Sequence, residues 1–485
     1  MYEIELKFQI PGARRAGVRR AVDRAGSRSL RLQAHYFDTP GRHLATAGLA
    51  LRLRKEGGRW VQTLKGRGDG LMLRLEHEVV LPRTHEASSI DLSRHDGTPA
   101  GHLLAQALRG VAQPPTVVYV TDIQRTRRQL RSGGAVIELA FDEGAILAGG
   151  ARLPVCEVEF ELLRGDPVAL LALAWRWVER HGLWLDVRSK AERGDRLARG
   201  EACAPPCHAE APALASNVTL AQAWAAMLRA GLAQVLPNAA EVAAGTATAE
   251  HLHQLRIGLR RLRTALREFG DGVPQTQAHW QAALAAPFAR LGVTRDRDAL
   301  AASVLPLLEA VGAPRVELHA VSGVDAGAVV REPSFSRLMI ELIAGADLAA
   351  RGGGAARPLT DALRPRLNRM HRRVSADAAA FASLDEATQH RVRKRLKRLR
   401  YACEFVASLY PPKAVARYLA ALRPAQEALG AGNDLTMALA AYRELTEEDP
   451  RAWFAVGWLS ARRAQLLQHA VRTLRKLAQA RRFWR

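Results

Sequence analysis

The segment Glu3-Ile4-Glu5-Leu6-Lys7-Phe8 alternates charged and apolar residues. In a β-strand, successive side chains point to opposite faces, so this period of two places the charged residues on one face and the apolar residues on the other. The same alternation recurs at Leu49-x-Leu51-x-Leu53. The segment therefore predicts an N-terminal β-sheet with one charged face and one apolar face.

Glycine pairs indicate how the strands of this sheet are connected. Gly57-Gly58 lies between two alternating runs, and Gly133-Gly134 separates a run that ends at Leu130 from one that begins at Ala135. Two glycines between strands are typical of a tight hairpin, so neighbouring strands are expected to be antiparallel. A helix is expected to follow the strands at residues 166–181.

The second half of the chain has a different composition. Residues 201–216 contain Pro205-Pro206 and Pro212 with little periodicity, which predicts a linker. Beyond it the sequence is rich in Ala, Leu and Arg and is expected to be entirely helical. Since 485 residues exceed the size of one compact domain, we predict an α+β protein with domains at 1–200 and 217–485.

The charge and the cysteine content narrow the class of protein. The formal net charge is +23, which favours binding to nucleic acid, anionic membranes or phosphate polymers and does not choose among them. Four scattered cysteines predict a reducing compartment. The sequence shows no signal-peptide pattern and no apolar run of membrane-spanning length, so we expect a cytoplasmic protein with no membrane partner.

Acidic residues recur at alternate positions of several predicted strands. They are Glu3 and Glu5, Glu76 and Glu78, Glu157, Glu159 and Glu161, with Asp142 after the strand at 135–141. So many carboxylates on one wall would repel one another unless cations neutralise them, and Mg²⁺ or Mn²⁺ are the natural counter-ions for oxygen ligands. A single strand of this kind is usually a solvated face, but the recurrence over five strands disfavours that explanation.

Basic residues follow the same alternation. They are Arg52 and Arg54, Lys65, and Arg125 and Arg127. A closed barrel would turn these faces inward and bring both signs of charge into one site. Phosphoryl transfer needs that mixture, because metal ions and basic side chains together offset the charge of a phosphate chain.

An ordered series of motifs over residues 1–200 resembles the CYTH domain of the triphosphate tunnel metalloenzymes. The motifs are Glu3-Ile4-Glu5-Leu6-Lys7, Tyr36-Phe37-Asp38-Thr39, Leu51-Arg52-Leu53-Arg54-Lys55, Thr63-Leu64-Lys65, Asp142-Glu143-Gly144, Glu157-Val158-Glu159-Phe160-Glu161-Leu162 and Ser189-Lys190. The resemblance implies an eight-stranded antiparallel tunnel that binds one or two divalent metal ions, Mg²⁺ or Mn²⁺, and a triphosphate.

The resemblance also implies roles for individual residues. The implied phosphate-binding residues are Lys7, Arg52, Arg54, Lys65, Arg125, Arg127 and Lys190. The implied metal and water ligands are Glu3, Glu5, Asp142, Glu157 and Glu159, with Glu3, Glu5 and Lys7 as the catalytic residues. Glu76, Glu78 and Glu161 have less support.

Family membership alone leaves the substrate open, because the family includes class IV adenylate cyclases and thiamine triphosphatases. The match at Glu3–Phe8 and at Cys156–Leu163, together with the appended helical domain, favours the bacterial inorganic triphosphatases.

The helical half contains an internal repeat. Counting from His253 and from His390, basic residues occupy the same offsets, and so do apolar residues. The basic residues are Arg256, Arg260 and Arg263 in the first copy and Arg393, Lys397 and Arg400 in the second; the apolar ones are Leu255, Leu259, Leu262 and Leu266, then Val392, Leu396, Leu399 and Cys403. About 38 residues after each histidine comes a second matching phrase. These phrases are Leu291-Gly292-x-x-Arg295-Asp296 and Leu429-Gly430-x-x-Asn433-Asp434. We predict duplicated units at about 217–375 and 376–485.

At 100° per residue, each histidine and its basic offsets lie within an arc of about 80° on a helix. We call His253, Arg256, Arg260 and Arg263 the first basic stripe, and His390, Arg393, Lys397 and Arg400 the second. Such density of charge repels itself unless an anion is near. Two stripes could face one groove and bind a flexible polyanion.

The helical half resembles the CHAD domain, a helical module associated with inorganic polyphosphate. The resemblance rests on both stripes, on Arg295-Asp296-x-Asp298 and on Asn433-Asp434, although the second copy has Asn433 in place of Arg295 and Thr436 in place of Asp298. It implies paired four-helix bundles around a basic channel, with the two stripes and Lys394 binding polyphosphate. A solvated basic helix and a nucleic-acid-binding helix are the alternatives; the second is disfavoured because no aromatic residues for base stacking interrupt the stripes.

These features predict a metal-dependent inorganic triphosphatase that hydrolyses tripolyphosphate to pyrophosphate and phosphate and binds long-chain polyphosphate. We expect a cytoplasmic protein that can associate with polyphosphate granules. The alternative is a polyphosphate-binding or scaffold protein whose N-terminal site is weak or acts as a nucleoside or thiamine triphosphatase or as a cyclase.

Overall fold

The computed structural model describes residues 2–68, 72–82, 89–270, 277–317, 324–351 and 359–485, without the side chains of Tyr2, Arg67, Gln277 and 293–303. The chain folds into two compact units. The first comprises Met1–Cys207, Val235–His251 and Gly327–Ala344, and the second comprises His208–Gln234, Leu252–Ala326 and Gly345–Arg485.

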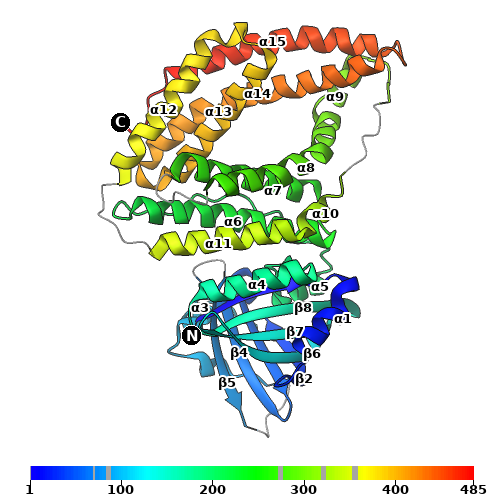
Figure 1. Ribbon diagram of the computed structural model, residues 1–485, viewed down its shortest axis with the longest axis vertical. Coiled ribbons are helices and arrows are strands. Elements are labelled where there is room, and N and C mark those ends of the chain that lie inside the picture. The colour runs from blue at the N-terminus through cyan, green and yellow to red at the C-terminus, as the bar shows by residue number, and fades with distance from the viewer. Residues whose placement is uncertain (1, 69–71, 83–88, 271–276, 318–323, 352–358) are drawn as a thin grey trace. The chain divides into compact units, whose positions relative to one another are not determined.

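The first unit contains a closed antiparallel β-barrel (Figure 1). Its strands are β1 (Tyr2–Gln9), β2 (Arg28–Asp38), β3 (Leu49–Glu56), β4 (Arg59–Arg67), β5 (Leu73–Leu81), β6 (Thr116–Ser132), β7 (Ala135–Ala148) and β8 (Ala151–Arg164). They follow the order β5-β4-β3-β2-β6-β7-β8-β1, and a pairing between β1 and β5 closes the ring. The two-residue strand β9 (Trp184–Leu185) adds to β1. The predicted eight-stranded barrel is therefore confirmed.

The apolar faces of the strands point outward and are covered by helices. Phe8 of β1 and Phe160 of β8 are fully buried and meet edge to face, with ring centroids 5.6 Å apart. Trp177 of helix α4 (Pro167–His181) packs on Phe160 from outside, and Leu104 of α3 (Pro99–Ala107) joins an apolar cluster with Leu51. The charged faces are therefore left to line the interior.

The predicted turns and the first predicted helix are also confirmed. Gly57-Gly58 joins β3 to β4 and Gly133-Gly134 joins β6 to β7. Gly133 and Gly134 have φ of +56° and +77°, which a residue with a Cβ rarely adopts. Helix α4 begins after Asp166, whose side chain accepts a hydrogen bond from the Val168 amide. The shorter helices of this half are α1 (Arg15–Val22), α2 (His43–Thr46) and α5 (Lys190–Arg199).

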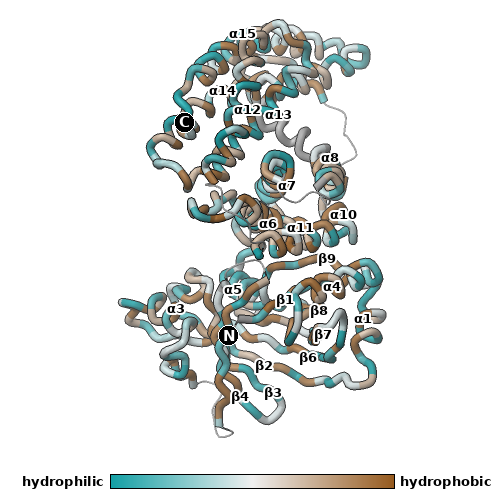
Figure 2. The backbone as a smooth tube through the Cα atoms, turned by 60° about the vertical axis from the view of Figure 1, so that its left-hand side comes forward, coloured by the Kyte–Doolittle hydropathy of each residue, from teal (hydrophilic) through white to brown (hydrophobic). Residues whose placement is uncertain are grey.

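Among the described residues, every element after Arg199 is a helix, and 201–216 carry no regular structure. The helices are α6 (Leu220–Ala244), α7 (Ala249–Phe269), α8 (Gln277–Ser303), α9 (Leu305–Ala310), α10 (Ala326–Arg331), α11 (Pro333–Arg351), α12 (Leu359–Ala380), α13 (Glu386–Phe405), α14 (Pro412–Leu445) and α15 (Ala452–Ala478). Hydrophilic and hydrophobic residues alternate along them, as expected of amphipathic helices (Figure 2). Within the described ranges, none of these helices has both the length and the apolar character of a membrane span.

Helices α7 and α13, which carry the two matching sequence patterns, contact each other through matching positions. All eight apolar offsets of the repeat are buried, at 1 % exposure or less. Arg261 of α7 bonds Glu404 of α13 at 2.6 Å, while Arg398 of α13 lies 3.5 Å from Glu268 of α7. Arg261 and Arg398 occupy the same offset from their histidines, so each helix uses the same position of the pattern to contact the other.

Candidate active site

Cross-strand register assembles the charged residues into rows on the interior wall. Glu5 of β1 lies opposite Glu161 of β8, and Glu161 lies opposite Glu138 of β7. Deeper along the same strands, Lys7 is opposite Glu159. Directly opposed residues project from the same face of a sheet, so these side chains share one wall.

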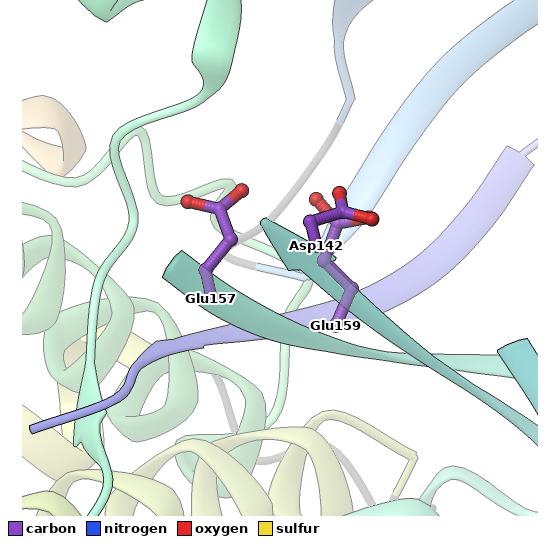
Figure 3. Close-up of side chains that lie close together, drawn as sticks. All are labelled: Asp142, Glu157 and Glu159. Carbon is purple, nitrogen blue, oxygen red and sulfur yellow. The ribbon is translucent and has the colours of Figure 1, made fainter. Parts of the chain in front are cut away.

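Three carboxylates of this wall form a tight group. Oxygens of Asp142, Glu157 and Glu159 lie within 4.8 Å of one another, and Asp142 and Glu157 are completely buried. They come from the adjacent strands β7 and β8 (Figure 3). We call these three residues the carboxylate trio. Their oxygen atoms are of the kind that a hard divalent ion prefers.

The ammonium group of Lys190 lies inside the carboxylate trio. Its Nζ is 2.6 Å from Asp142, 2.5 Å from Glu157 and 2.8 Å from Glu159. Burial disfavours the charged ammonium, but the three carboxylates outweigh it and raise the pKa of Lys190. Lys190 is the first residue of α5, which begins with a capping box between Ser189 and Glu192. The helix start therefore fixes the lysine at this place.

Two arginines complete the neutralisation of the trio. Arg125 donates two hydrogen bonds to Asp142, at 2.7 and 2.6 Å, and one to Glu159 at 2.5 Å. Arg193 pairs with Glu157. Three carboxylates thus have three cations of the protein, and a metal ion could bind among them only if Lys190 moved away.

A second acidic group lies around Glu5 and is less completely neutralised. Lys65 contacts Glu76 at 2.7 Å and Glu3 at 3.1 Å. Burial and the like charge of Glu138 raise the pKa of Glu161, which has no basic partner within ion-pair distance among the described residues. Carboxylates that crowd one another in this way favour a bound cation. Glu5 lies 3.4 Å from Arg74, so Glu161 is the member of this group that most lacks a counter-charge. Among the described residues, the carboxylate trio is the group of three acidic side chains whose oxygens already lie close enough together to hold an ion.

The basic side of the barrel is crowded as well. Burial and the like charges of Arg52 and Arg125 lower the pKa of Arg54. The Nε atoms of Arg52 and Arg54 are buried without a hydrogen-bond acceptor. Burial also lowers the pKa of Lys7, whose Nζ donates to the Arg188 carbonyl. Guanidinium donors without acceptors are what an anion would satisfy.

The structure brings most of the predicted phosphate-binding residues together on the interior wall of the barrel. Lys7, Arg52, Arg54, Lys65 and Arg125 lie on the interior wall with Glu3 and Glu5, while Arg127 is 46 % exposed and lies 3.8 Å from Glu138. Glu78 contacts Arg54 at 3.4 Å.

Sequence reasoning missed Glu138 and Arg193. Glu138 lies four residues before Asp142 and so on the same strand face, and Arg193 lies one helical turn after Lys190. Those spacings were the signals that could have identified them.

In the helical half, the two basic stripes lie close to each other. Burial and the charges of Arg260 on α7 and Arg393 on α13 lower the pKa of Lys397 to about 6. His390 bonds Asn433 at 2.9 Å, and Lys394 is exposed. The side chains of Arg295, Asp296 and Asp298 lie outside the described residues.

Comparisons with known proteins match each half of the chain separately. Residues 1–194 match the CYTH domain, and residues 226–443 match the CHAD domain. An inorganic triphosphatase of Haemophilus influenzae is 31 % identical over 162 residues, which are 33 % of this chain and 44 % of that protein. The match therefore spans less than half of the relative.

Solved structures give similar matches. The CHAD domain of the plant Ricinus communis is 31 % identical, covering 57 % of this chain and 98 % of that one, with a TM-score of 0.48. A putative adenylyl cyclase from Hippeastrum, described as having a dominant triphosphatase activity, is 17 % identical over 41 % of this chain and 96 % of that one, with a TM-score of 0.29.

Replacing Lys190 tests whether it is the resident cation of the trio. We expect Lys190→Met to lower the free energy of unfolding of the barrel by about 3 to 5 kcal/mol, because it leaves buried carboxylates in excess. Added Mg²⁺ or Mn²⁺ should recover part of that loss, since the vacated trio can then hold an ion. Thermal unfolding with and without metal measures both effects.

The matched control is Lys55→Met, on the exposed side of β3. It should change the melting temperature little and show no added response to metal. An equal metal response in the wild type and in Lys190→Met would contradict the assignment.

Proposed function

The chain consists of a CYTH domain at residues 1–194 followed by a CHAD domain at residues 226–443, and from this we propose that it is a metal-dependent inorganic triphosphatase that binds polyphosphate. The proposed reaction is the hydrolysis of tripolyphosphate to pyrophosphate and phosphate. The observation that carries the proposal is that one barrel wall brings carboxylates and basic side chains, two kinds of charge, within a few ångström of each other, as in the contacts of Lys65 with Glu3 and Glu76 and of Arg52 and Arg54 with Glu78. A triphosphate with a divalent ion satisfies both.

The basic residues would bind the phosphate chain. Arg52, Arg54 and Arg125 come from neighbouring regions of the barrel wall, and Lys7 lies on the strand that also carries Glu3 and Glu5. Their positive charges would offset the negative charge of the phosphate oxygens and hold the chain in one orientation. Lys65 and Lys190 would neutralise the carboxylates beside it.

The acidic residues would hold Mg²⁺ or Mn²⁺, with Glu3, Glu5 and Glu161 as the proposed ligands on the wall where Glu5 faces Glu161 and Glu161 faces Glu138. When bound, the ion would offset the charge on the phosphate oxygens and make the attacking water more acidic. The water oxygen would bond to a terminal phosphorus, the bond from that phosphorus to its bridging oxygen would break, and pyrophosphate would leave. The trio of Asp142, Glu157 and Glu159 would hold a metal only after Lys190 is displaced.

The helical half would bind long-chain polyphosphate through the two basic stripes. The support is their mutual repulsion: Lys397 lies in a partly buried position beside Arg256 and Arg260 of α7 and Arg393 of α13, with Asp434 of α14 as an acidic neighbour. A flexible polyanion between the helices would neutralise several of these charges at once.

A second hypothesis makes the protein a polyphosphate-binding or scaffold protein whose tunnel is weak or acts on another triphosphate. Phosphate release from tripolyphosphate, ATP, thiamine triphosphate and long polyphosphate, with Mg²⁺ or Mn²⁺, separates the two hypotheses by relative kcat/KM. Cyclic AMP formed from ATP would indicate a cyclase instead.

The acidic site is tested by Glu5→Gln. We expect kcat/KM for tripolyphosphate to fall at least about a hundredfold, because a neutral amide cannot help to hold the ion that offsets phosphate charge. Glu143→Gln is the control, since Glu143 pairs with Arg15 and Arg19 on the outer face of β7. Undiminished hydrolysis by Glu5→Gln, or hydrolysis without metal, would contradict the proposal.

The stripes are tested by the pH dependence of polyphosphate binding. Lys397 has a pKa of about 6 in the free protein and is mostly neutral at pH 7, and a bound polyanion would raise that pKa. Binding would then take up a proton, so affinity should fall between pH 7 and 8.5, by up to about tenfold per pH unit, at constant ionic strength.

Lys397→Arg remains charged throughout and should flatten this dependence. Proton uptake can be measured by calorimetry in buffers of different ionisation enthalpy. If Lys397→Arg keeps the wild-type pH dependence, Lys397 is not the titrating group.

A further inference from the structure

Three arginines of the first basic stripe surround one phenyl ring. The guanidinium carbons of Arg256, Arg260 and Arg263 lie 5.3, 5.7 and 5.7 Å from the centroid of the Phe288 ring. The arginines occupy successive turns of α7, and Phe288 comes from α8 and is half-buried. These distances lie within the range in which a ring face attracts a cation.

Arg260 and Arg263 have no carboxylate partner among the described residues. The second basic stripe is different: Arg393 lies 3.8 Å from Asp434, and Arg400 donates to Glu404 at 2.6 Å. Among the described residues, Arg260 and Arg263 therefore contact the ring and no carboxylate, whereas Arg393 and Arg400 each have an acidic partner.

The two stripes differ in one neighbouring residue, which the internal repeat identifies. Phe288 lies three residues before Leu291, and the equivalent position before Leu429 is Gln426. Gln426 accepts a hydrogen bond from Arg400 at 3.0 Å. One N–H donor of Arg400 is therefore already occupied by the amide oxygen of Gln426. At the equivalent position of the first pattern, the ring of Phe288 lies beside Arg263 and accepts no N–H hydrogen bond from it.

An aromatic ring is suited to hold cations that must later meet an anion. The ring face attracts guanidinium groups but carries no net charge, so it cannot compete with phosphate as a carboxylate would. It also limits the rotamers of side chains that would otherwise repel one another and spread apart. Less conformational entropy is then lost when a polyanion binds.

We propose that Phe288 is a positioning residue that holds Arg256, Arg260 and Arg263 ready for a phosphate chain. This inference rests on the proposed binding of polyphosphate by the helical half. It assigns a neutral aromatic support to the first basic stripe.

The test compares variants of the full-length chain in their affinity for long polyphosphate, with a chelator present to stop hydrolysis. Phe288→Leu keeps an apolar side chain and removes the ring, and we expect it to weaken binding about fivefold to tenfold. Phe288→Tyr and Phe288→Trp keep a ring face and should bind within about twofold of the wild type. Phe454→Leu is the matched control, because Phe454 is an exposed phenylalanine on α15 with no cation over its ring among the described residues.

Two further measurements separate positioning from damage to the fold or to the site. The salt dependence of binding should stay unchanged in Phe288→Leu, because the same cations still meet phosphate, but should weaken in the double variant Arg260→Ala, Arg263→Ala. Thermal unfolding identifies any variant that fails to fold. If Phe288→Leu fails to fold, Phe288→Met takes its place, because the longer and more flexible methionine side chain can adapt to an irregular gap.

The outcomes distinguish this inference from the function on which it rests. Loss of affinity in Phe288→Leu with retention in Phe288→Tyr and Phe288→Trp supports it. If the double arginine variant loses affinity while Phe288→Leu does not, or if the tyrosine and tryptophan variants lose as much as the leucine variant, Phe288 has no positioning role. If the double arginine variant binds normally, polyphosphate binding by this stripe fails and the inference falls with it.

Discussion

The contact between Lys190 and three carboxylates, two of them completely buried, is the interaction on which the barrel depends. A wall that buries Asp142 and Glu157 completely is stable only if cations lie within bonding distance, since an unpaired buried charge is costly. Lys190 meets that need from the first residue of α5, where the capping box at Ser189 starts the helix. The docking of α5 and the charge balance of β7 and β8 are therefore a single structural feature.

The charged side chains of the rest of the interior are paired with opposite charges to different extents. Fully paired charges stabilise the barrel, whereas incompletely paired ones can bind a ligand. The carboxylate trio is balanced by Lys190, Arg125 and Arg193. Glu161 crowds other carboxylates, and Arg54 crowds other guanidinium groups. A balanced set has little to gain from an external ion, whereas two unbalanced sets of opposite sign gain from a ligand that carries both charges. The residues of this wall therefore differ in how much of their charge is left to bind a ligand.

Much of the barrel follows from the alternation that begins at Glu3, because a period of two decides which side chains share a face in every strand. Strand order, closure by β1 and β5, and the pairing of Glu5 with Glu161 depend on register, which no local pattern encodes. The sequence could therefore predict a charged lining and its residue types. It could not predict that Lys190 would lie within the trio, because that contact joins a helix start to strands about 30 to 50 residues earlier.

In the helical half, too, the sequence predicted the buried faces of the helices but not the contacts that their charged residues make. The repeat at His253 and His390 correctly identified the buried apolar faces of α7 and α13, since those follow from helical periodicity alone. The two basic stripes carry matching charges, but their surroundings among the described residues differ. One stripe contacts Phe288 and the other contacts Asp434, Glu404 and Gln426. If the two patterns arose by duplication, as the sequence predicts, the residues that build the helix pair are the ones kept, because both helices need the same core. Neighbouring positions are then free to change, so two copies with the same charges can come to differ in how readily those charges meet an anion.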